Sequence, residues 1–257
     1  MIKIFIIGID GKMGRAVCRA CSETNDFELV GGLDTMPDMD FKVFTNVDDV
    51  DVEYDVIIDF SRPETLSQCI SLTKGKIPVV LATTGYNKID IKKIEILSKK
   101  VPVFMSGNMS WGVFVLQKLV NDATKLLYGD FDIEIIEKHH NQKVDAPSGT
   151  ANMLADSISE AVKLQRDTQC ALPPTMPNYI YGREGTNAKR KSDEVAIHAV
   201  RGGTVVGEHE VSFYGKDEVI TISHSALSRN IFATGALKAG KFLIGKKPGL
   251  YSMKDMV

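Results

Sequence analysis

A polar stretch at residues 137–151, EKHHNQKVDAPSGTA, gathers side chains that could do chemistry. Two adjacent histidines and a lysine precede small residues that predict a helix start: they are His139, His140 and Lys143, followed by Ser148, Gly149 and Thr150. The first turn of a helix carries unpaired N–H groups and the positive end of the helix dipole, which together attract anions. With cationic side chains beside it, the stretch predicts a site for one or two substrate carboxylates.

The same stretch could also move protons. The pKa of a lysine such as Lys143 falls readily when its ammonium group is desolvated or lies near other cations, so it can act as a proton donor. A histidine can stabilise developing charge or relay a proton near neutral pH. The stretch therefore combines an anion site with acid–base groups.

Two other interpretations of this stretch stay open. In a metal site both histidines could be ligands, but neighbours on a strand point in opposite directions, no Glu or Cys stands at zinc spacing, and the ammonium of Lys143 would repel a cation. We therefore expect no metal. A polar loop that only caps a helix is the second alternative. His198, His209 and His224 are scattered in other segments, where we expect sheet-surface or interface positions.

A glycine-rich turn near the N-terminus suggests a dinucleotide as a second ligand. Gly8, Gly11 and Gly14 follow an apolar run and open a helical pattern. Such a turn lets the backbone approach a pyrophosphate and directs helix N–H groups at it. The spacing differs from G-x-G-x-x-G, but Asp34 closes the next apolar run twenty residues after Gly14, where a ribose-binding carboxylate is expected. A tight turn without a ligand is the alternative.

The elements that must position these groups alternate between strand and helix over the first 106 residues. Predicted strands are residues 2–7, 28–34, 54–60, 77–85 and 101–106, and predicted helices begin near Met13, run from Ser61 to about Lys74, and span residues 90–100. This alternation predicts an α/β fold with a doubly wound parallel sheet of the Rossmann type. The loops ATTG (82–85) and SGNMS (106–110) would lie beyond the strand ends, where small residues let a flat ring approach the backbone.

The pattern changes after residue 110. Predicted helices are residues 111–127, a helix from Gly149, and 230–245, and alternating segments are 131–140, 194–200, 204–213 and 218–226. The alternating segments predict an antiparallel or mixed sheet that packs on one face and leaves the other face available for contacts. Residues 170–191 show no hydrophobic periodicity and predict a long loop, called the excursion below.

Composition excludes several classes of function. With 257 residues, 44% apolar residues and a net charge of -2, the chain has no overall field that would recruit nucleic acid or an anionic membrane. No apolar run reaches the ~18 residues that span a bilayer, and the first apolar run predicts a strand, not a signal peptide. The four cysteines are expected to be small buried thiols of a cytosolic protein, despite one C-x-x-C spacing; they are Cys18, Cys21, Cys69 and Cys170.

Five stretches together resemble the 4-hydroxy-tetrahydrodipicolinate reductase (dihydrodipicolinate reductase) family of bacterial lysine biosynthesis. They are GIDGKMGRA, ATTGY, SGNMSWGV, EKHHNQKVDAPSGTA and VRGGTVVGEHEVSF, and they cover nearly the whole chain in order. The resemblance implies NADH- or NADPH-dependent reduction of the cyclic dicarboxylate 4-hydroxy-tetrahydrodipicolinate to tetrahydrodipicolinate. It also implies a cytoplasmic homotetramer, with a discontinuous dinucleotide-binding domain at 1–109 and 221–257 and an inserted α+β domain for substrate binding and tetramerisation at 110–220.

The resemblance also assigns roles to residues. The cofactor would contact Gly8, Ile9, Asp10, Gly11, Lys12, Met13, Asp34, Ala82, Thr83, Thr84, Ser106, Gly107, Asn108 and Met109. The catalytic pair would be His139 and Lys143, and the substrate would contact His140, Lys143, Ser148, Gly149 and Thr150. This agrees with the chemistry, because hydride addition to a conjugated imine leaves a carbon that needs a proton, which Lys143 can donate.

Two departures from the family pattern bear on the cofactor. Met109 stands where the family often has phenylalanine, and Thr35 follows Asp34 where some members have an arginine for the 2′-phosphate of NADPH. We therefore expect NADH to be preferred. A catalytically silent NAD-binding relative and another two-domain NAD-dependent dehydrogenase are the alternatives. The intact set of His139, Lys143 and Ser148–Thr150 argues against the first, and the second class lacks the double histidine before a glycine-rich helix start.

Overall fold

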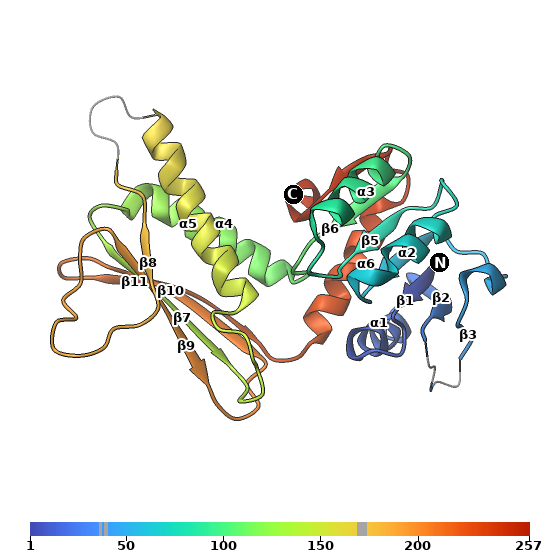
Figure 1. The fold of residues 1–257 in the computed structure, drawn as a ribbon, viewed down its shortest axis with the longest axis horizontal. Helices are drawn as coiled ribbons and strands as arrows, with labels where there is room; N and C mark the ends of the chain where they lie inside the picture. The colour runs from blue at the N-terminus through green and yellow to red at the C-terminus, as the bar shows by residue number, and fades with distance from the viewer. Residues whose placement is uncertain (36–37, 39–40, 169–173) are drawn as a thin grey trace. The chain divides into compact units, whose positions relative to one another are not determined.

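The computed structural model describes residues 1–35, 38, 41–168 and 174–257, so Cys170 lies outside the described part of the chain. The chain divides into two compact units. Residues 1–111 and 229–257 form the first unit, and residues 112–228 form the second (Figure 1).

The first unit is built on a seven-stranded parallel sheet in the order β12-β6-β5-β4-β1-β2-β3. Its strands are β1 (Ile2–Ile7), β2 (Phe27–Leu33), β3 (Val43–Phe44), β4 (Val56–Asp59), β5 (Val79–Leu81), β6 (Pro102–Met105) and β12 (Gly249–Tyr251). Its helices are α1 (Lys12–Ser22), α2 (Leu66–Leu72), α3 (Lys88–Ser98) and α6 (Asn230–Leu243), with short 3-10 turns at η1 (Val47–Asp49), η2 (Pro63–Thr65) and η3 (Met253–Met256). The strand order reverses direction between β1 and β4, as in dinucleotide-binding folds, and the predicted doubly wound sheet is confirmed.

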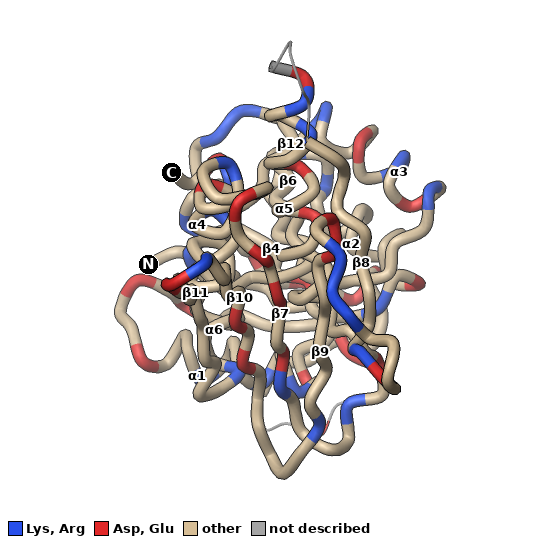
Figure 2. The backbone as a smooth tube through the Cα atoms, turned by 90° about the vertical axis from the view of Figure 1, so that its left-hand side faces the viewer, with Lys and Arg blue, Asp and Glu red and all other residues tan. Residues whose placement is uncertain are grey.

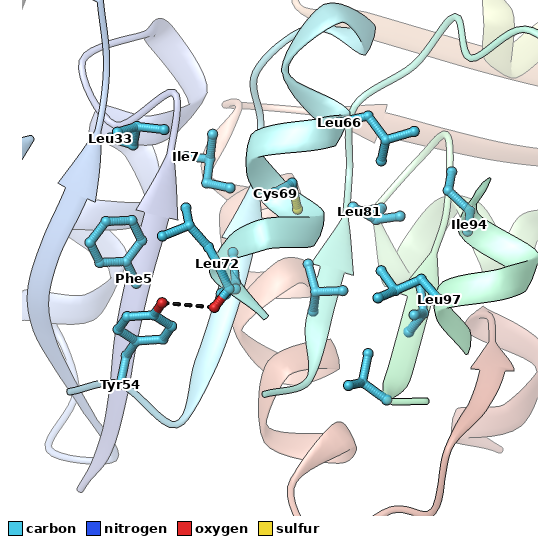
Figure 3. Close-up of a cluster of buried hydrophobic side chains, with 14 residues drawn as sticks. Phe5, Ile7, Leu33, Tyr54, Leu66, Cys69, Leu72, Leu81, Ile94 and Leu97 are labelled. Carbon is cyan, nitrogen blue, oxygen red and sulfur yellow. Dashed lines mark hydrogen bonds between the residues drawn. The ribbon is translucent and has the colours of Figure 1, made fainter. Parts of the chain in front are cut away.

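Helices cover both faces of this sheet because its strands are apolar on both sides. On the α2 and α3 side, a buried cluster joins the strands to both helices, and its labelled members in Figure 3 are Phe5, Ile7, Leu33, Tyr54, Leu66, Cys69, Leu72, Leu81, Ile94 and Leu97. The Tyr54 hydroxyl donates to the Leu72 carbonyl over 2.8 Å, so its polar end is satisfied inside the cluster. Each large apolar side chain buried in this way contributes about 1.5–3 kcal/mol. Helices α1 and α6 contact each other on the opposite face.

The second unit is a five-stranded mixed sheet in the order β11-β10-β7-β9-β8. Its strands are β7 (Asp132–His139), β8 (Asn178–Ile180), β9 (Glu194–Arg201), β10 (Gly207–Tyr214) and β11 (Val219–Ala226), and its helices are α4 (Trp111–Leu127) and α5 (Gly149–Thr168). Ile133 and Ile135 of β7 lie in one buried cluster with Leu116 of α4 and Leu154 of α5. The other face is polar, and Figure 2 shows acidic residues in red on β7 and β10.

Several predicted boundaries were wrong, and short elements were missed. The helix predicted from Ser61 to about Lys74 begins instead with the 3-10 turn at Pro63, because the Ser61 hydroxyl bonds to Asp59 and Thr65 and caps no helix. It ends at Leu72. The strand predicted at 77–85 is only β5. Strands β3, β8 and β12 have two or three residues each and were not predicted, and β8 lies within the predicted excursion 170–191.

The thiol prediction holds for two of the cysteines. Cys21 and Cys69 are buried and free, while Cys18 is only half-buried. Burial raises the pKa of Cys21 to about 12, so its thiol is protonated near neutral pH and is a poor nucleophile. The C-x-x-C spacing on α1 therefore gives no sign of a redox pair.

Candidate functional site

The glycine turn forms where β1 passes into α1. Gly8 has a φ of +76°, in the region that glycine adopts most easily, and α1 begins at Lys12. A Cβ added at Gly14 would lie 2.2 Å from the carbonyl oxygen of Gly8 and 2.4 Å from that of Ile9. The first turn of α1 is thus held against the backbone of the loop, which is the close approach that a pyrophosphate-binding turn requires.

A pocket of about 400 Å³ opens beside this turn, at the carboxyl ends of β1, β2 and β4. Its walls include Gly8, Asp10, Gly11, Asp34, Thr35, Thr45, Ser61, Arg62 and Thr65. Asp34 accepts hydrogen bonds from the backbone N–H groups of Asp10, at 2.9 Å, and Thr35, at 2.8 Å. The structure thus brings the glycine turn and the predicted ribose-binding carboxylate into one pocket, at the point where the strand order reverses.

The cations around this pocket differ in their partners. Arg15 forms an ion pair with Asp10, and its guanidinium also donates to the backbone oxygens of Asp10 and Asp38. Lys12 is exposed at the start of α1. Arg62, which the sequence analysis did not assign, lies in the pocket wall that also contains Asp34.

The two small-residue loops follow β5 and β6, which are neighbours, so both loops lie at one edge of the sheet. Ala82 and Thr83 are buried, and Thr84 is exposed. In the second loop Ser106 donates to the Asn108 carbonyl over 2.6 Å, and Gly107 is exposed. The Met109 side chain is buried, and a Cβ on Gly235 of α6 would lie 1.7 Å from the Met109 carbonyl oxygen. At Met109 both the side chain and the carbonyl oxygen are thus packed inside the first unit, and Gly107 is the exposed residue of the second loop.

In the second unit, the histidine stretch begins at the end of β7. His139 is buried, and its Nδ1 lies 2.6 Å from Oε2 of Glu137, a carboxylate with no exposed surface. Arg201 at the end of β9 donates to both Glu137 oxygens over 2.7 Å. The Ser148 N–H donates to Oε1 of Glu137 over 3.0 Å. Glu137 therefore accepts hydrogen bonds from three segments: β7, β9 and the start of α5.

Ser148 caps α5 and joins it to β10. Its hydroxyl accepts the Ala151 N–H at 3.2 Å and lies 2.9 Å from Nε2 of His209. The His209 ring packs edge-on against the His139 ring, with centroids 5.1 Å apart. His209 was expected at a sheet-surface or interface position, but it is buried within the chain, beside the predicted catalytic histidine. Burial and the neighbouring His139 lower the pKa of His209 to about 4, so its ring is neutral at physiological pH.

Lys143 lies in the loop between β7 and α5. Its ammonium bonds to both carboxylate oxygens of Asp145, at 2.8 and 2.9 Å, and its backbone N–H donates to the His140 carbonyl. The hydrogen bond from Lys143 lowers the pKa of Asp145, which therefore stays ionised. His140 is half-buried and directly follows the strand.

The charges of this cluster are set by burial and by pairing. Burial raises the pKa of Glu137, but hydrogen bonds from Arg201, His139 and Ser148 outweigh it and bring the net pKa below the usual range. Burial lowers the pKa of His139, and its contact with Glu137 only partly offsets this. At neutral pH the cluster therefore holds an ionised Glu137 and a neutral His139.

Three residues of this cluster were missed or misplaced by sequence analysis: Glu137, Arg201 and His209. The signal for Glu137 was present, because the period of two along β7 puts it on the same face as His139 and the buried isoleucines. Arg201 and His209 come from other strands, and only the sheet pairing brings them to the site. Among the described residues, no helix is long and apolar enough to cross a bilayer.

Two family models match the chain. The model described as dihydrodipicolinate reductase, N-terminus, matches residues 2–109, and the one described as dihydrodipicolinate reductase, C-terminus, matches residues 112–257. The 4-hydroxy-tetrahydrodipicolinate reductase of Caldanaerobacter subterraneus subsp. tengcongensis is 51% identical over 100% of this chain and 98% of its own length. The protein of the same name from Clostridium tetani is 49% identical over 100% of this chain and 97% of its own.

Solved structures share the fold. The dipicolinate-bound dihydrodipicolinate reductase from Paenisporosarcina sp. TG-14 matches with a TM-score of 0.77 at 24% identity over 100% of both chains. The DAP dehydrogenase of C. glutamicum in complex with DAP matches with a TM-score of 0.54 at 16% identity, over 98% of this chain and 92% of its own. At these identities the two structures support the fold alone.

Proposed function

The chain belongs to the dihydrodipicolinate reductase family, and from this premise we propose how its residues divide the work of the reaction. It is an NAD(P)H-dependent oxidoreductase that reduces 4-hydroxy-tetrahydrodipicolinate to tetrahydrodipicolinate in diaminopimelate and lysine biosynthesis. The observation that best supports the proposed site is the Glu137–His139 pair beside Lys143 and the N-terminus of α5. The oxidation of NADH, followed by absorbance with the enzymatically generated lysine precursor, tests the activity.

The first unit would hold the nicotinamide cofactor, and its residues fit that group. The pocket between the glycine turn and Asp34 suits a pyrophosphate and a ribose, and Gly14 lets α1 begin close against that turn. We assign the pyrophosphate to the turn from Gly8 to Met13, and the nicotinamide ring to residues 82–84 and 106–109. When bound, the reduced cofactor supplies the hydride.

The second unit would bind the dicarboxylate and supply the proton. We assign the substrate carboxylates to His140, Lys143, Ser148, Gly149 and Thr150. The N–H and hydroxyl groups of Ser148 also contact Glu137, Ala151 and His209, so Ser148 in addition fixes the start of α5. Lys143 donates the proton, and the ion pair with Asp145 holds its ammonium group in the loop before α5 until the substrate arrives.

These roles correspond to a nucleotide domain and a substrate domain. The predicted boundaries at 109/110 and 220/221 need one adjustment, because β11 pairs with β10 from Val219 to Ala226. We therefore propose the second boundary near residue 228, where the two compact units divide. We also propose that the enzyme is cytoplasmic.

We propose that the polar face of the five-stranded sheet forms a homotetramer. Val200, Tyr214 and Val219 are exposed on strands whose opposite face packs on α4 and α5, so apolar side chains stand among polar ones on this surface. Light scattering after size-exclusion chromatography is expected to give about four times the chain mass of 28.3 kDa. A monomeric mass at micromolar concentration would contradict this assembly.

We expect NADH to be preferred over NADPH by roughly tenfold in kcat/KM, about 1.4 kcal/mol of discrimination. The Asp34 carboxylate can accept hydrogen bonds from both ribose hydroxyls of NADH, whereas the 2′-phosphate of NADPH would bring negative charge close to it. Arg15 is already paired with Asp10. Arg62 lines the same pocket as Asp34, and its positive charge could bind the 2′-phosphate of NADPH. Arg62→Ala is therefore expected to increase the preference for NADH.

Steady-state kinetics with both cofactors at one ionic strength decide this. If the native protein has equal kcat/KM values with NADH and NADPH, and Arg62→Ala prefers NADH, then Arg62 binds the 2′-phosphate. A native preference for NADPH would contradict the role given to Asp34.

A further inference from the structure

Glu137 is buried and ionised, and it lies within hydrogen-bond distance of the predicted catalytic histidine, although it has no route of its own to a substrate. A carboxylate with no exposed surface is uncommon unless every oxygen is paired. Here Oε1 accepts from Arg201 and Ser148, and Oε2 accepts from Arg201 and meets His139. We propose that Glu137, held by Arg201, is a positioning residue that fixes the tautomer and the orientation of His139 for the reduction, an inference that rests on the proposed function.

The geometry decides which ring nitrogen carries the proton. An ionised carboxylate can only accept, so the contact of 2.6 Å requires Nδ1 of His139 to donate. In the neutral ring, Nε2 is then left with its lone pair. A Cβ at Gly207 would lie 3.1 Å from this nitrogen, so the glycine at the start of β10 leaves Nε2 uncovered by a side chain. His139 thus presents an acceptor, and Lys143 a donor.

Arg201 ties this histidine to the loop that carries the lysine. Besides its two bonds to Glu137, its guanidinium donates to the Asp145 carbonyl over 2.8 Å. Asp145 in turn holds the Lys143 ammonium. One side chain of β9 therefore fixes the supports of both predicted catalytic residues, and a change at Arg201 should disturb His139 and Lys143 together.

The groups that face His139 come from every segment packed against it. They are Glu137 on β7, Arg201 on β9, His209 on β10, and Lys143 in the loop before α5. Only Glu137 is an anion, and its contact raises the pKa of His139 against burial and the nearby cations. Removal of this carboxylate should lower the pH at which His139 takes up a proton.

The test is Glu137→Gln, with the tautomer read from histidine ¹⁵N chemical shifts in the resting protein. The native His139 is expected to be protonated at Nδ1 at neutral pH. One glutamine oxygen cannot serve both Arg201 and His139, so the variant should show mixed tautomers and a lower protonation pH. We expect kcat to fall by about 10- to 100-fold, while the affinity for NADH is unchanged.

The sheet offers a matched control on the same strand. Glu134 lies on the opposite face of β7 from Glu137. Its Oε2 is 2.6 Å from Nε2 of His198, and its two carboxylate oxygens accept hydrogen bonds from the two terminal nitrogens of Arg183. Glu134→Gln should therefore change the ring signals of His198 and leave those of His139 as they are. If Glu137→Gln does not fold, Glu137→Asp is the second variant. Its shorter carboxylate can still pair with Arg201 but no longer reaches Nδ1 of His139, so mixed tautomers and a lower protonation pH of His139 are again expected.

Two results would overturn the proposal. One is an unchanged His139 tautomer in Glu137→Gln, which would indicate a merely structural carboxylate even if kcat falls. The other is a kcat within twofold of the native value. Because the ¹⁵N measurement needs neither substrate nor cofactor, it separates this inference from the proposed function. A native protein without reductase activity would refute the function, whereas the ring signals would still decide whether Glu137 sets the state of His139.

Discussion

Lys143→Ala is expected to lower kcat by about 10²–10⁴-fold, the usual loss when a general acid is removed. Lys143 is the one ammonium in the loop between β7 and α5, and its charge is held in place by Asp145. Because it belongs to the second unit, NADH should bind to the variant with nearly native affinity. Stopped-flow hydride transfer and fluorescence titration with NADH measure the two quantities separately.

Two further variants sharpen this test. Lys143→Arg keeps the charge, but a guanidinium does not release its proton near neutral pH, so turnover should stay low if Lys143 is the proton donor. Lys125→Ala removes an ammonium of the same unit that pairs with Asp122 on the surface of α4, and it should leave turnover unchanged. If Lys143→Ala keeps near-native turnover, or loses NADH affinity first, the assigned role is wrong.

Gly14→Ala is expected to abolish tight binding of either cofactor, with a dissociation constant raised at least about tenfold. The added methyl would overlap the carbonyl oxygens of Gly8 and Ile9, at 2.2 and 2.4 Å, so α1 must move away from the turn. Overpacking of this kind also destabilises a fold by about 1–3 kcal/mol. Isothermal titration with NADH and urea unfolding followed by circular dichroism measure the two effects.

Gly240→Ala is the matched control for Gly14→Ala. Gly240 also lies in a helix of the first unit, but a Cβ there would meet Val56 and Ile58 at ordinary distances of 3.6 Å or more. Because alanine is favoured over glycine within helices by about 1 kcal/mol, this variant should be at least as stable as the native protein. Native affinity for NADH in Gly14→Ala would contradict the role of the turn in binding pyrophosphate.

The architecture of the first unit was predictable because its strands are apolar and its helices periodic. Residues 2–7 match β1 residue for residue, and in the second unit residues 111–127 match α4 in the same way. The histidine stretch was also accessible from local sequence, since Ser148 and Gly149 do mark the start of α5. The binding and catalytic roles assigned to these residues remain predictions.

Helix-capping motifs show where prediction from short stretches of sequence fails. Ser61 and Glu64 have the spacing of a capping box, as do Asn87 and Asp90, but only the second pair makes the reciprocal hydrogen bonds. The Ser61 N–H and hydroxyl are taken by the buried carboxylate of Asp59, a contact that depends on where β4 ends. In the same way, Arg201 and His209 reach Glu137 and Ser148 only through strand pairing, which no local pattern specifies.

The division of the first unit between the two ends of the chain has a consequence for protein synthesis. Helix α6, which packs on β4, β5 and β6 and fixes the turn at Met109 through Gly235, is translated after all of residues 112–228. At about 5–20 residues per second, that interval lasts roughly 6–25 s. During it, the glycine turn and Asp34 already exist, but the sheet face that α6 will cover is open to water and to other nascent chains. The ribosome therefore exposes an apolar surface of the nucleotide-binding unit for seconds in every round of translation, and chaperone demand should be greatest in that interval.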